Sequence, residues 1–75
     1  MKNEDMIRMA NQIAAYFHAY GDEEGIAGTA DHIKMFWEPR MREQLFKYLA
    51  DTGGKGLSPM ALAAAKKLDK ARQTA

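Results

Sequence analysis

The chain has no cysteine, and among its 75 residues it has only two prolines, two histidines and one tryptophan. The absence of cysteine excludes disulfide bonds and thiolate metal sites, two common ways of stabilising a small domain. A domain of this size buries only about 60% of the surface that its unfolded chain exposes, and it keeps few kcal/mol of net stability. We therefore expect a partner polypeptide to provide part of the stabilisation.

The sequence also lacks a strong net charge and any long apolar run. A net charge of +1 gives little electrostatic attraction to nucleic acids or membranes. No stretch is long and apolar enough to predict a transmembrane helix, and the first residues lack the apolar core of a signal peptide. These features predict a cytoplasmic protein.

The charges that are present are distributed unevenly along the chain. Five of the eleven Lys and Arg residues follow Gly54, against one of the ten Asp and Glu residues. Such charges on a helix are usually only solvated. They leave open a second hypothesis, a small helical nucleic-acid-binding protein that uses Lys66, Lys67, Lys70 and Arg72.

Hydrophobic periodicity and turn residues predict an all-α fold, a small bundle of three to four helices in a single domain over residues 1–75. Asn3 and Asp22 are expected to cap the first two helices, and Gly21 is expected to separate them. Pro39 fits the first position of a third helix and disfavours helical geometry just before it. Ser58 is expected to cap the last helix. The predicted helices span about 4–20, 22–37, 39–52 and 58–71.

The apolar side chains on the inner faces of the second and fourth predicted helices differ in size. The inner face of the second helix carries Ile26, Ala30, Ile33 and Trp37 at spacings of four, three and four. The corresponding face of the fourth helix consists of Ala61, Ala64, Ala65 and Leu68. With so few large side chains, the fourth helix is expected to pack weakly and to fray after about Lys70.

Met35 lies nearly opposite the inner face of the second helix, and Phe36 lies between the two faces. Phe46 lies away from the inner face of the third helix, and together the three residues predict an exposed apolar surface of the kind that marks binding sites. Gly25 and Gly28 lie inside the second helix, where each costs about 1 kcal/mol relative to alanine. Their presence indicates close approach by a backbone, either of a partner or of neighbouring helices in the same chain. The same apolar excess would also let isolated chains associate with one another.

Arg40 and Arg42 flank this apolar region and allow two interpretations of equal weight. They are ordinary surface arginines with Glu38 and Glu43 as local partners, or they pair with acidic groups of another chain. For Trp37 itself, a position in the core is the better interpretation.

The sequence gives no catalytic or metal-binding pattern. His18 and His32 have no ligand spacing between them, and no serine has a plausible base. The glycine-rich segment 53–58 lacks the spacing of a phosphate-binding loop, and no predicted strand precedes it. We expect no catalytic residue, no bound metal and no cofactor in this chain.

Two stretches, residues 6–17 and 30–42, resemble the delta subunit of soluble NAD-dependent formate dehydrogenases. The resemblance covers about two-thirds of the chain, from Met6 to about Gly56. Its most specific part is the run Phe-Trp-acid-Pro-Arg-Met at residues 36–41. The family pattern favours aspartate before the proline, where this chain has Glu38; because aspartate caps helices better, the third helix is expected to start less rigidly here.

The resemblance implies a small, cofactor-free, non-catalytic accessory subunit of an NAD-dependent formate dehydrogenase. In such enzymes the larger subunits carry a molybdenum or tungsten pterin, iron–sulfur clusters and a flavin. The delta subunit is expected to dock on the molybdenum-containing subunit and to support assembly, stability or cofactor maturation. By position, the residues expected to contact the partner are Asn11, Gln12, Met35, Phe36, Trp37, Arg40, Met41 and Arg42.

Overall fold

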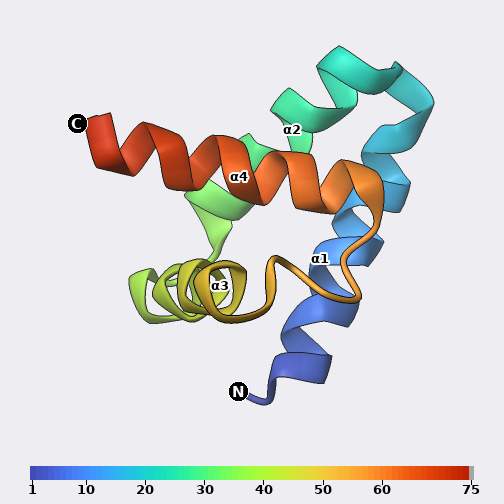
Figure 1. Cartoon of the computed structure of the whole chain (residues 1–75). Coiled ribbons are helices and arrows are strands. Elements are labelled where there is room, and N and C mark those ends of the chain that lie inside the picture. The colour runs from blue at the N-terminus through green and yellow to red at the C-terminus, as the bar shows by residue number, and fades with distance from the viewer. Residues whose placement is uncertain (75) are drawn as a thin grey trace.

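Four α-helices joined by short connections make up the computed structural model, which describes residues 1–74. The described residues contain no strand, and the predicted all-α class and small helical bundle are confirmed. In Figure 1, α4 runs across the front of α2, and α3 is seen almost end on. The elements are α1 (Asn3–Phe17), the 3₁₀ turn η1 (His18–Tyr20), α2 (Asp22–Phe36), α3 (Pro39–Thr52) and α4 (Pro59–Thr74).

The first two helices begin and end differently from the sequence expectation. The helical segment continues to Tyr20, but its last three residues tighten into η1 before Gly21, which has a positive φ of 91°. Asn3 and Asp22 are not caps. Each is the first residue of its helix, and no side chain caps either N-terminus. Asp22 still lies in the first turn, where a carboxylate interacts favourably with the helix dipole.

The last two helices start at the expected prolines. Pro39 is the first residue of α3, and Glu38 precedes it in an extended conformation with no side-chain cap. Ser58 precedes Pro59, and its Oγ accepts a hydrogen bond from the backbone N–H of Ala61 at 3.3 Å. Ser58 is therefore the N-cap of α4, as predicted.

The core lies where α1, α2, α3 and α4 meet, and it is built from a few large side chains separated by alanines. Ile33 and Leu45 are fully buried, and Trp37 retains 6% exposure. This agrees with the core interpretation of Trp37. The buried cluster consists of Met6, Ala10, Ala14, Ile33, Trp37, Leu45, Met60, Ala61 and Ala65.

The prediction of a weakly packed, fraying α4 is wrong. Ala61 and Ala64 are completely buried, and α4 packs along α2 as well as against α1 and α3. Small side chains let two helix axes approach closely, so a narrow alanine stripe is enough to build this contact. The helix continues past Lys70 to Thr74.

The glycines of α2 are explained by neighbours within the same chain. A Cβ atom on Gly25 would lie 2.5 Å from Cε of Met60 and 2.9 Å from the carbonyl oxygen of Phe17. A Cβ atom on Gly28 would lie 2.6 Å from the ring of Phe17. Of the two interpretations of these glycines, close packing by helices of the same chain is confirmed.

Phe46 is not part of an exposed surface, contrary to the sequence expectation. Its side chain is only 7% exposed. Because α4 extends beyond Lys70, it brings the guanidinium of Arg72 over the Phe46 ring, with Cζ at 4.5 Å from the ring centroid. This distance is that of a cation–π contact.

Candidate partner-binding surface

Large aromatic and apolar side chains are exposed together where the end of α1 faces α2. The exposed fractions are 68% for Tyr16, 55% for Tyr20, 75% for Met35 and 69% for Phe36. Half-buried Phe17 and His32 connect the three exposed rings, and Met35 precedes Phe36 on α2. We call this set of six residues the aromatic surface.

The rings of the aromatic surface form a continuous chain of contacts. The Phe17 ring lies 5.0 Å from that of Tyr16 in an edge-on arrangement and 5.9 Å from that of Tyr20. It also lies 6.1 Å from the His32 ring, which in turn lies 4.7 Å from the ring of Phe36. Such contacts between rings hold the side chains in place and so reduce the entropy lost on binding a partner.

The local sequence explains why these rings meet. Tyr16 and Tyr20 are four residues apart at the end of α1 and in η1, and His32 and Phe36 are four residues apart on α2. Residues at this spacing share one side of a helix. Gly28 has no side chain, so Phe17 lies directly on α2 and joins the two pairs.

An exposed cluster of this kind is suited to contact with another protein. Tyr, Phe and Met are enriched in protein–protein interfaces, and burying one such side chain contributes about 1.5–3 kcal/mol. The aromatic surface has rigid rings at its centre and exposed rings around them. This arrangement provides anchors for a partner.

Of the eight predicted contact residues, Met35 and Phe36 lie on the aromatic surface and are the most exposed of its members. Trp37 is buried, so its side chain offers a partner almost no surface. Phe36 and Trp37 face different sides of the molecule because successive residues along a helical path point about 100° apart. The predicted Phe36–Trp37 pair thus divides into a surface residue and a core residue.

The three residues of α3 that were predicted to contact a partner differ in their exposure and in their contacts within the chain. Arg40 is exposed, whereas Met41 is half-buried against the core. Nη1 of Arg42 donates a hydrogen bond to the carbonyl oxygen of Lys34. Arg42 therefore ties α3 to the last turn of α2, an alternative to the predicted pairing with Glu38 or Glu43.

The polar candidates on α1 have different roles. Gln12 is exposed. Asn11 is engaged within the chain: its Nδ2 donates to the carbonyl oxygen of Gly56 at 3.0 Å, and its Oδ1 accepts from the backbone N–H of Ser58 at 2.8 Å. Both hydrogen-bonding atoms of this amide hold the segment before α4, so Asn11 is a structural residue in the free chain.

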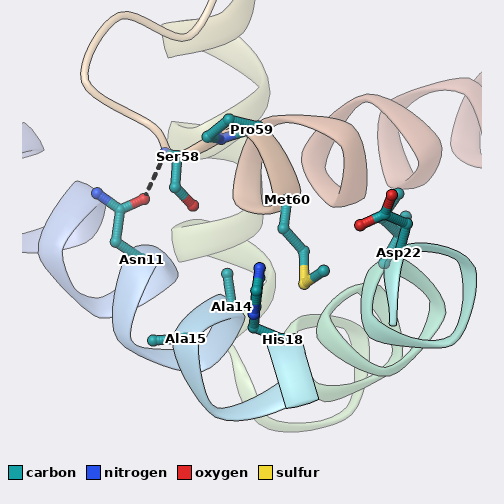
Figure 2. A pocket seen from close by; sticks show the side chains of 9 residues that line it. Asn11, Ala14, Ala15, His18, Asp22, Ser58, Pro59 and Met60 are labelled. Atoms are coloured by element: carbon teal, nitrogen blue, oxygen red, sulfur yellow. Dashed lines mark hydrogen bonds between the residues drawn. The ribbon is translucent and has the colours of Figure 1, made fainter. Parts of the chain in front are cut away.

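Asn11 also lies on the wall of an open pocket of about 590 Å³ between α1, α2 and the start of α4. Figure 2 shows the side chain of Met60 between those of His18 and Asp22, all three of which line this pocket. Both His18 and Asp22 are exposed, and the hydroxyl of Ser58 serves as the cap of α4. No nucleophile–base pair is formed by these groups.

In residues 1–74, no group of three or more His, Asp or Glu side chains is placed to hold a metal ion. Within the same range, no helix has the length and hydropathy needed to cross a membrane.

Sequence reasoning missed four members of the aromatic surface. Phe17 and Tyr20 recur at the three-and-four spacing of the apolar stripe of the first helix, which favours the core, and Tyr16 lies outside that stripe. His32 falls on the same side of the second helix as Met35, but it was not among the predicted contact residues. The spacing of four in each of the two pairs was an available signal. The contact between the pairs was not, because it depends on how α1 crosses α2 at Gly28.

A protein-family model matches most of the chain. A model of accessory subunits, described as NADH-dependant formate dehydrogenase delta subunit FdsD, matches residues 5–65. The chain belongs to this family of formate dehydrogenase delta subunits. Comparison with curated proteins and with solved structures gives no significant match.

Proposed function

We propose that the chain is a non-catalytic accessory subunit that docks through its aromatic surface on a larger subunit of an NAD-dependent formate dehydrogenase. The docking partner in this proposal is the subunit with the molybdenum or tungsten pterin. The larger subunits would also carry the iron–sulfur clusters and the flavin. Docking would support assembly, stability or cofactor maturation of the enzyme in the cytoplasm.

The exposure of Tyr16, Tyr20, Met35 and Phe36 on one region of the molecule is the observation that supports this docking site. Family membership implies partner subunits, and a partner that covers these four side chains would remove a large apolar area from water. At about 1.5–3 kcal/mol for each large side chain, this burial is enough to dominate the binding energy.

Co-purification from the native cell tests the proposal. A tagged chain with Met35→Ser and Phe36→Ser is compared with the tagged wild-type chain for recovery of the larger subunits and of formate-oxidising activity. Because both side chains are largely exposed, these changes leave the fold intact. We expect recovery of the larger subunits to fall at least about tenfold, a loss of about 1.4 kcal/mol or more in binding.

The matched control is a chain with Lys47→Ser and Asp51→Ser, two exposed residues of α3 outside the aromatic surface and outside the predicted contact residues. It should recover the larger subunits as the wild type does. Equal recovery with both double variants, when circular dichroism shows that both are folded, would reject the aromatic surface as the docking site.

A further inference from the structure

A second surface feature lies on another side of α2, in a cleft of about 500 Å³ bounded by α2, α3 and α4. Four cationic side chains from the three helices line it: Lys34, Arg42, Lys67 and Arg72. Asp31 and Glu43 also line the cleft, so its cations outnumber its carboxylates. We call this feature the basic cleft.

The base of the basic cleft is apolar. Ala30, Phe46 and Leu68 line it together with the cations. The Phe46 ring is covered on one side by the guanidinium of Arg72, which also forms an ion pair with Asp69 at 2.8 Å. An occupant of this cleft thus needs apolar side chains for its base and negative charges for its rim.

Two of the four cations have no side-chain partner within the described part of the chain. The side chains of Lys34 and Lys67 form no hydrogen bond or ion pair there, whereas Arg42 and Arg72 are engaged with Lys34 and Asp69. Lys34 and Lys67 project from α2 and α4, on two sides of the cleft. Carboxylates of a bound segment would be able to pair with both.

We infer that the basic cleft binds a short acidic peptide segment, with apolar residues between its carboxylates, from the polypeptide that covers the aromatic surface. This inference rests on the proposed function, because it assigns a second contact to the same partner. The two surfaces lie on different sides of α2, but Lys34 of the cleft and Met35 of the aromatic surface are neighbours in the chain, so one partner polypeptide is able to reach both. Charge complementarity of this kind increases the association rate and fixes the orientation of the partner.

A nucleic acid fits the arrangement less well. A phosphate backbone requires a row of cations on one face, but the basic residues of α4 are divided between faces. Lys67 and Arg72 line the cleft, whereas Lys66 and Lys70 do not. The apolar base formed around Phe46 would also remain unused by phosphates.

Fluorescence anisotropy of the full chain with labelled synthetic peptides of about twelve residues provides the test. All peptides share the same Leu and Phe positions and differ in whether Glu, Gln or Lys occupies the positions between them. The acidic peptide should bind, and its affinity should fall as salt rises because the pairing is electrostatic. Failure of the acidic peptide to bind, or equal binding of the Gln peptide, would overturn the inference.

A chain with Lys34→Glu and Lys67→Glu should lose at least about tenfold in affinity for the acidic peptide. The control chain with Lys47→Glu and Lys55→Glu carries the same change in net charge outside the cleft, and its affinity should fall by less than about threefold. Equal losses in the two chains would attribute binding to overall charge and contradict the inference. If a short DNA duplex binds through Lys34 and Lys67 while the acidic peptide does not, the occupant is a nucleic acid and the inference is wrong.

The inference and the proposed function fail in different ways. If the chain recovers the larger subunits through Phe36 but binds no acidic peptide, the proposed docking site stands and the inference about the basic cleft is wrong. If the chain binds the acidic peptide but recovers the larger subunits equally well after Met35 and Phe36 are replaced, the basic cleft stands as a peptide-binding site and the proposed docking site is wrong.

Discussion

Asn11 on α1 and Ser58 before α4 are joined by a hydrogen bond of 2.8 Å from the Ser58 backbone N–H to Oδ1 of Asn11. The two residues are 47 positions apart, and the same amide also donates to the carbonyl oxygen of Gly56. One side chain therefore positions the segment that leads into α4. Because Ser58 caps α4, this contact also fixes where the helix begins.

Replacing Asn11 with alanine should lower the free energy of unfolding by about 1–2 kcal/mol. The change removes two hydrogen bonds and leaves the part-buried N–H of Ser58 without its acceptor. Chemical denaturation followed by circular dichroism measures the loss. The control is Gln12→Ala, an adjacent exposed position, which should change stability by less than about 0.5 kcal/mol. Equal effects of the two substitutions would contradict the structural role of Asn11.

Gly25→Ala should destabilise the chain by about 1–3 kcal/mol, although alanine is the better helix former by about 1 kcal/mol. The added Cβ would lie 2.5 Å from Cε of Met60 and 2.9 Å from the carbonyl oxygen of Phe17. A double-mutant cycle with Met60→Ala isolates the side-chain contact, since Met60→Ala removes the atoms in closest approach. We expect the two substitutions to be less harmful together than the sum of their separate effects. If the effects of the two substitutions on stability are strictly additive, α2 and α4 lie farther apart than in this structure.

Adjacent residues Phe36 and Trp37 should differ sharply in their effects on stability. Trp37→Ala removes a buried core side chain and should cost about 3–5 kcal/mol, enough to unfold much of a domain this small. Phe36→Ala removes a side chain that is 69% exposed and should cost less than about 0.5 kcal/mol. Thermal denaturation followed by far-ultraviolet circular dichroism compares the two without relying on tryptophan fluorescence. Similar losses would contradict the division between core and surface.

Periodicity and turn residues were sufficient to predict the helical class, because each signal is local. Ile33 and Trp37 could be assigned to the core from spacing alone, and Pro39 could be assigned to a helix start. The burial of Phe46 could not be predicted, because it depends on α4 extending far enough to bring Arg72 over the ring.

The site was predictable only where one helix face defines it. Met35 and Phe36 were found as apolar residues off the inner face of α2. Tyr16 joins them through the contact of Phe17 with α2 at Gly28, which is a property of helix packing. The engagement of Asn11 with a segment more than forty residues away is likewise invisible to local spacing.

Site-specific photo-cross-linking in the native cell tests the central claim most directly. A benzophenone-bearing amino acid is placed at Phe36 in one tagged chain and at Ala50, an exposed position on α3, in another. Irradiation of the Phe36 chain should yield a covalent product with the pterin-carrying subunit of formate dehydrogenase, and irradiation of the Ala50 chain should yield little of it. Cross-linking to that subunit from Ala50 but not from Phe36 would contradict docking through the aromatic surface.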